Sequence, residues 1–189
     1  MPILEGPFQL PAEGVEPLLL LGRPIMGDGP TMNVTDPSDG RLIGRISTIS
    51  PGSVPRLIRE TRAAWQATGW WELLPHQRAR LLADTAGIIE ARADILAELQ
   101  MLENGKTRRE SHGQALNAAS IFRYYASVCE SAEEQMPPAR GNYITMSVYE
   151  PYGVVAALTP WNSPLTMGAQ KLAPALAGGN AVVLKAAET

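Results

Sequence analysis

The chain has 189 residues, of which 45% are hydrophobic and 19% charged, and its formal net charge is -3. This is the length of about one domain with a buried core, and so small a net charge gives no electrostatic reason to expect a nucleic acid or a membrane as partner. The sequence has no run of 18 apolar residues and no basic leader followed by an apolar segment, which favours a cytoplasmic location.

Cysteine and histidine are too scarce for a disulfide framework or a metal site. The single cysteine, Cys129, excludes an internal disulfide, and the two histidines, His76 and His112, lack the spacing of metal ligands. We therefore expect no metal in this protein.

Residues 17–49 contain short apolar segments separated by the turn-forming stretches GDGPT and TDPSDG. This pattern predicts a β-hairpin or meander. From 53 to 132 the apolar residues recur at helical spacing instead, which predicts a layer of amphipathic helices.

Several residues mark the expected ends of these helices. Ser53 is placed to cap the first helix and Gly69 to end it, and Asn104-Gly105 predicts a left-handed stop farther along. A last helix is expected from about 108 to 129. The second helix is expected to bury an apolar stripe made of Leu81, Leu82, Thr85, Ile88 and Ile89.

The last part of the chain predicts an α/β fold. The stretch RGNYITMSVYEP, residues 140–151, alternates weakly and predicts an extended strand. Two short apolar segments, 153–158 and 181–185, then flank a helical pattern over 164–177, and strand, helix and strand predict one parallel βαβ unit. Its two strands end at the same edge of the sheet, where open α/β sheets bind ligands.

The loop TPWN leaves the first of these strands at that edge. Pro160 and Pro164 restrict the backbone around it, Trp161 adds a flat apolar surface, and the Asn162 side chain carries two N–H donors. Rigidly held donors of this kind suit an oxyanion that forms during a reaction. On spacing alone, the simpler interpretation is that Asn162 caps the helix that follows.

The segment EPYGVVAALTPWNSPLTMGAQKLAPALAGGNAVVLKAAE, residues 150–188, resembles the signature of the aldehyde dehydrogenase superfamily. The segments NVTDPSDGRLIGRI, ENGKT and RYYAS also resemble the family, so the resemblance covers nearly the whole chain from about residue 30. It implies the N-terminal portion of a Rossmann-like fold, in an enzyme that depends on NAD or NADP.

The resemblance also implies a division of the chain. Residues 1–132 would form the hairpin and helical layer of the cofactor-binding domain, and residues 133–150 would begin an oligomerisation strand system. Residues 151–189 would form the first βαβ unit of the dinucleotide-binding domain. We expect this portion to be incomplete, with the catalytic domain absent from the chain.

The family assigns roles to residues that match its motif. Asn162 would donate its side-chain amide to the oxyanion, while Lys185 and Glu188 would bind the adenosine ribose. A carboxylate at the ribose would repel a 2′-phosphate, which favours NAD over NADP. The full set of implied cofactor-binding residues is Thr159, Pro160, Trp161, Asn162, Lys185 and Glu188.

Lys171 matches a lysine that the family places near its catalytic region, and an ordinary polar position on the helix is the alternative. Ser163 stands where many members carry phenylalanine, and Ala186 stands where proline is frequent. The family's nucleophilic cysteine and general base belong to segments after residue 188. Cys129 has no adjacent histidine, so we expect a small buried hydrophobe rather than a nucleophile.

The implied activity is the oxidation of an aldehyde to a carboxylic acid by a protein that forms homo-oligomers. A cysteine adds to the aldehyde, Asn162 stabilises the oxyanion, hydride passes to NAD, and water hydrolyses the thioester. We expect the 189 residues alone to be inactive. The alternative is a non-catalytic subunit that associates with other chains or binds nucleotide, because a lone strand pair leaves an apolar edge unpaired.

Overall fold

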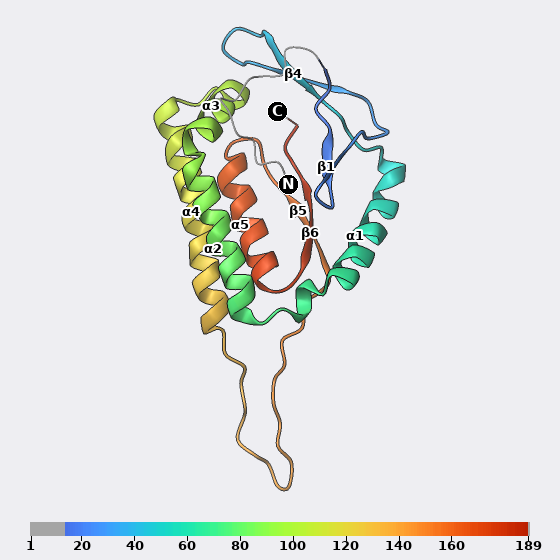
Figure 1. The fold of residues 1–189 in the computed structure, drawn as a ribbon, viewed down its shortest axis with the longest axis vertical. Coiled ribbons are helices and arrows are strands. Elements are labelled where there is room, and N and C mark those ends of the chain that lie inside the picture. The colour runs from blue at the N-terminus through green and yellow to red at the C-terminus, as the bar shows by residue number, and fades with distance from the viewer. Residues whose placement is uncertain (1–13, 189) are drawn as a thin grey trace.

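The computed structural model describes residues 14–188, and a parallel pair of strands lies at its centre. Strands β5 (Val154–Leu158) and β6 (Ala181–Lys185) pair in register from one end to the other, and helix α5 (Pro164–Ala177) connects them. Helix α1 (Val54–Thr68) packs on one face of the pair, and α5 covers the other face (Figure 1). The predicted α/β class and its parallel βαβ unit are confirmed.

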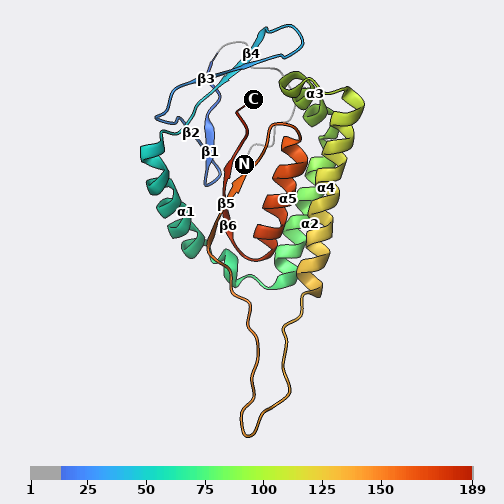
Figure 2. The ribbon, with the colours of Figure 1, turned by 180° about the vertical axis from the view of Figure 1, so that it is seen from behind.

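Three further helices complete the layer outside α5, namely α2 (Pro75–Ala91), α3 (Ala93–Asn104) and α4 (Arg108–Ser131). Helices α2 and α4 pack against each other and against α5 (Figures 1 and 2). Small side chains dominate the core between them, which lets the helices approach closely. The buried members are Ala79, Leu82, Ala86, Ala118, Ala119, Phe122, Ala126, Cys129, Ala169 and Ala173.

The helices begin and end largely where the sequence predicts. Gly69 and Gly105 follow α1 and α3 in the left-handed conformation, with φ of 64° and 70°. Thr107 caps α4 through a capping box, in which its hydroxyl accepts from the Glu110 N–H while the Glu110 carboxylate accepts from the Thr107 N–H. Ser53 occupies the cap position of α1, but its hydroxyl donates to the Asp28 carboxylate at 2.6 Å instead of capping the helix.

The predicted buried stripe of α2 is wrong in part. Leu81 and Ile88 are 47% and 51% exposed, while the buried positions of the helix are Ala79, Leu82 and Ala86. The face that α2 buries is set by its contact with α4 and α5, and this contact selects small side chains over the larger ones beside them.

The N-terminal segment forms two antiparallel hairpins, which agrees with the expected hairpin or meander. Strands β1 (Leu18–Leu20) and β2 (Arg23–Ile25) make the first, and strands β3 (Met32–Thr35) and β4 (Leu42–Ile46) make the second. Single turns of 3₁₀ helix, η1 (Pro51–Ser53) and η2 (Trp70–Glu72), flank α1.

Residues 132–150 form a long arm that projects from the end of the molecule opposite the end of β6 (Figures 1 and 2). The chain there is extended, but the predicted strand over 140–151 is wrong. The arm has one isolated bridge, Arg140 to Tyr143, and one backbone hydrogen bond, from the Ser147 N–H to the Gln135 carbonyl at 2.8 Å. A strand needs a continuous ladder of hydrogen bonds to a neighbour, and these two contacts within the arm are too few to form one.

A buried polar side chain on α3 gives a test of the fold. Gln100 on α3 is 2% exposed, and neither its amide nitrogen nor its oxygen has a hydrogen-bond partner within residues 14–188. Replacing Gln100 by Met keeps the length of the side chain and removes the cost of desolvating the amide. We expect Gln100→Met to raise the free energy of unfolding by about 1 kcal/mol in urea denaturation. The exposed Gln66→Met should change it little, and a loss of stability in Gln100→Met would show that internal water satisfies this amide.

Candidate functional site

The carboxyl ends of β5 and β6 bring the predicted loop and the predicted ion pair to one edge. The register pairs Leu158 with Lys185, and the two segments remain hydrogen-bonded at the next residue, Thr159. The Thr159 N–H donates to the Lys185 carbonyl at 3.1 Å, and the Thr159 hydroxyl donates to the same oxygen at 3.4 Å. The loop therefore starts from a point fixed to the end of β6.

The rest of the loop is held by side chains from the helical layer. The Asn104 side-chain amide donates to the Trp161 carbonyl, and the Lys106 ammonium donates to the Asn162 carbonyl. Gln114 on α4 donates to the Ser163 hydroxyl at 3.3 Å. Three consecutive residues of the loop, Trp161, Asn162 and Ser163, therefore each accept a hydrogen bond from the helical layer.

The helix after the loop does not use Asn162 as its cap. Helix α5 begins at Pro164, whose fixed φ suits the first helical position, and the residue in the N-cap position is Ser163. The cap interpretation of Asn162 is therefore wrong. Its side chain is exposed, and no hydrogen bond within residues 14–188 involves its amide.

Lys185 and Glu188 form an ion pair beside the loop, with the lysine Nζ donating to Glu188 Oε1 at 2.7 Å. The hydrogen bond and the positive charge of Lys185 hold the pKa of the Glu188 carboxyl below its usual value. The two side chains are 56% and 79% exposed, so a ligand could reach both. Trp161, which is 63% exposed, adds an accessible aromatic surface to the same loop.

The other candidate residues lie away from this arrangement. Lys171 is half-buried on α5, in the helix rather than in the loop. Cys129 is buried in the core and contacts the carbonyls of Pro75 and Ala177 through its sulfur, at 3.4 and 3.5 Å. The expectation that Cys129 is a buried hydrophobe is confirmed.

Sequence reasoning missed Asn104 and Lys106. Both belong to the segment ENGKT, which carries part of the family resemblance, but the sequence gives no role to either side chain. Their contacts join residues 57 and 56 positions apart. Such pairs become visible only once α3 is packed beside the loop.

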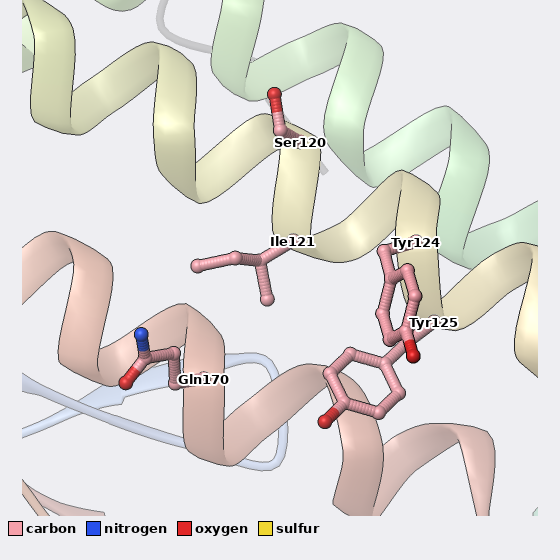
Figure 3. Close-up of a pocket in the computed structure, with 5 residues that line it drawn as sticks. All are labelled: Ser120, Ile121, Tyr124, Tyr125 and Gln170. Carbon is pink, nitrogen blue, oxygen red and sulfur yellow. The ribbon is translucent and has the colours of Figure 1, made fainter.

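A surface hollow lies between α4 and α5. It is lined by Ser120, Ile121, Tyr124, Tyr125 and Gln170 (Figure 3). None of these residues is charged, and none belongs to the predicted site. An uncharged hollow of this kind offers no cation for a phosphate, so it is a poorer candidate for binding a dinucleotide than the strand edge.

Residues 14–188 also bear on two other classes of site. Those residues include no group of three or more histidine, cysteine, aspartate or glutamate side chains that could hold a metal ion. None of their helices combines the length and the apolar character needed to cross a bilayer.

A parallel βαβ unit with an anchored polar loop and an accessible ion pair at the carboxyl edge defines this protein as an α/β protein, and this edge is where open α/β sheets commonly bind ligands. A family comparison identifies the family. The model of the aldehyde dehydrogenase family matches residues 25–189, and the chain belongs to that family.

Curated relatives and solved structures agree with this assignment. The mitochondrial aldehyde dehydrogenase family 2 member B4 of Arabidopsis thaliana is 35% identical over 85% of this chain and 30% of its own length. The mitochondrial aldehyde dehydrogenase of Equus caballus is 37% identical over 84% of this chain and 32% of its own. The indole-3-acetaldehyde dehydrogenase AldA of P. syringae, solved in complex with NAD⁺ and IAA, superposes with a TM-score of 0.87 at 30% identity. That superposition covers 93% of this chain and 36% of the other, so the chain spans about a third of the relatives it matches.

The ion pair gives a direct test of the site's electrostatics. Because Lys185 stabilises the charged carboxylate, the pKa of Glu188 should lie below its ordinary value of 4.5. The ion pair should therefore be intact at pH values above this lowered pKa and be lost as the pH falls through it. In a carboxyl NMR titration, Lys185→Met should return the pKa of Glu188 toward 4.5, while Lys171→Met should not change it. An equal pKa of Glu188 in the native protein and in Lys185→Met would contradict the pairing.

Proposed function

We propose that this chain forms the cofactor cleft and supplies the oxyanion donor of an NAD-dependent aldehyde dehydrogenase, which oxidises an aldehyde to a carboxylic acid. One observation carries the proposal. The loop 159–163 is tied to β6 and to the helical layer through its backbone and Ser163, while the Asn162 side-chain amide makes no hydrogen bond within residues 14–188. A donor that is held in place and left unused suits an acceptor from outside the chain.

The chemistry of Lys185 and Glu188 fits the adenosine ribose of a dinucleotide. An ammonium donates and a carboxylate accepts, so the two groups together can bind a pair of neighbouring hydroxyls. Bound NAD would supply the acceptor for the hydride that leaves the substrate. The negative charge of Glu188 supports NAD over NADP, because it would repel a 2′-phosphate. Two similar structures, AldA and PnpE, were solved with NAD, which supports the same choice.

Asn162 acts on the substrate. When a thiolate adds to the aldehyde carbon, the carbonyl oxygen becomes an anion, and the Asn162 amide donates a hydrogen bond to that oxygen. The donor is useful because the backbone that carries it is held before the reaction, so less reorganisation is needed as the charge appears. Thr159, Pro160 and Trp161 form the wall of the cleft on the same loop. Lys171 remains a candidate for a role near the catalytic region.

The arm favours a second function, namely association with another chain. Its apolar side chains are largely exposed, and its backbone has few partners within the described residues. The exposed side chains are Met136, Tyr143, Ile144, Met146, Val148 and Tyr149. We propose that the arm pairs with a second copy in a homo-oligomer, in keeping with the oligomerisation role expected for 133–150. The cytoplasm is our proposed compartment, although two relatives carry the word mitochondrial in their names.

Asn162→Ala tests the catalytic role. In a protein that joins this chain to the segments supplying the family's nucleophilic cysteine, we expect turnover of an aldehyde to fall by roughly 10² to 10³, the range for the loss of one oxyanion donor. Asn117→Ala, an exposed change on α4, is the matched control and should leave turnover unchanged. Near-normal turnover in Asn162→Ala would remove this residue from the oxyanion site.

Glu188→Gln tests the cofactor role by calorimetric titration of the chain with NAD. We expect the Kd for NAD to rise about tenfold, since a hydrogen bond to a charged group is worth about 1.5 kcal/mol or more. The Kd for NADP should change less or fall, because the repulsion of the 2′-phosphate is removed. Glu130→Gln, exposed near the end of α4, serves as the control. Equal NAD affinity in Glu188→Gln and the native chain would place the ribose elsewhere.

A further inference from the structure

Two side chains from the end of α3 and the turn after it hold the loop 159–163. They donate hydrogen bonds to the backbone carbonyls of two consecutive residues, Trp161 and Asn162. We propose that Asn104 and Lys106 are positioning residues, which fix the backbone of Trp161 and Asn162 so that the Asn162 amide faces the reacting oxygen. This inference rests on the proposed function, because it gives Asn162 its role. Neither residue touches substrate in this account, since both act through the backbone of the loop.

The two prolines leave part of the loop free to turn. Pro160 and Pro164 fix their own φ angles and restrict the residues before them, but ψ of Trp161 and φ of Asn162 remain adjustable. These two angles set the direction of the Asn162 side chain. The hydrogen bonds from Asn104 to the Trp161 carbonyl and from Lys106 to the Asn162 carbonyl restrain the peptide units on each side of Asn162.

The backbone that carries the two donor side chains is itself restrained. Gly105, between them, has φ of 70°, and its N–H donates to the Met101 carbonyl at 2.9 Å. A Cβ at this glycine would lie 2.9 Å from Cγ of Pro37, so the turn is confined by the β3–β4 hairpin as well. The capping box of Thr107 and Glu110 fixes the other side. Both side chains therefore reach the loop from a defined backbone, which is what a positioning shell requires.

Positioning matters because the rate of a reaction depends steeply on the relative positions of the reacting groups. A displacement of about 1 Å can lower a rate by roughly 10²-fold, even when no reacting group is changed. Lys106 also places a positive charge next to Asn162, which favours negative charge developing nearby. The simpler alternative is that the two contacts only strengthen the packing of the helical layer on the loop.

Relaxation of ¹⁵N in the labelled 189-residue chain separates these possibilities. In the native chain, the backbone N–H groups of Asn162 and Ser163 belong to the two restrained peptide units and should be as rigid as the helices, with order parameters of about 0.85. In Lys106→Met we expect those two values to fall below about 0.6, while those of Ala119 and Phe122 in the core stay unchanged. Lys106→Arg, which retains a charged donor, should restore the rigidity. Asn104→Leu should lower the order parameter of Asn162 more than that of Ser163.

Arg109→Met is the matched control, because it removes a positive charge from the same end of α4 without removing a contact to the loop. It should leave the loop rigid. Unchanged order at Asn162 and Ser163 in both Lys106→Met and Asn104→Leu would overturn the inference. Loss of order throughout the core in these variants would also overturn it, because the contacts would then serve general packing.

An activity measurement keeps this inference apart from the proposed function. In a protein with dehydrogenase activity that carries this chain, Lys106→Met should lower kcat about ten- to a hundredfold and change the KM for the aldehyde less than threefold. If the loop loosens while Asn162→Ala leaves turnover normal, Lys106 still anchors the loop and the proposed oxyanion role is wrong. If the loop stays rigid in the variants, the positioning role is wrong whatever the activity of Asn162→Ala.

Discussion

The parallel pairing of β5 with β6 is the constraint on which the rest of the structure depends. Because α5 returns the chain to the same end of the sheet, Leu158 and Lys185 meet in register and both strands end at one edge. The loop that carries Asn162 and the ion pair of Lys185 with Glu188 can meet only because of this arrangement. Moving β6 by one residue would face its side chains the other way and separate the two.

The packing of the helices also holds this edge in place. The alanines of α2, α4 and α5 bring these helices close together, and the turn after α3 then lies beside the loop 159–163 (Figure 1). From that turn, Asn104 and Lys106 reach the loop carbonyls, while Gln114 on α4 reaches Ser163. A change in the helical core would thus reach the site through the position of this turn.

The sequence predicts local features well and distant contacts poorly. Gly69 and Gly105 mark helix ends because glycine adopts positive φ freely, and the two apolar segments predict the parallel strands. The contact of Lys106 with Asn162 could not be predicted, since it depends on where α3 packs. Leu81 and Ile88 were misplaced because hydrophobicity alone does not show which face of α2 meets α4. The arm was misassigned because strand pairing depends on a neighbour, which local pattern does not supply.

Titration of the ¹⁵N-labelled chain with NAD, followed by backbone and side-chain amide shifts, decides whether the carboxyl edge of β5 and β6 binds the dinucleotide as proposed. We expect concentration-dependent shifts at Thr159, Trp161, Asn162, Lys185 and Glu188. Shifts confined to Tyr124, Tyr125 and Gln170 in the hollow between α4 and α5, or no shifts at millimolar NAD, would contradict it.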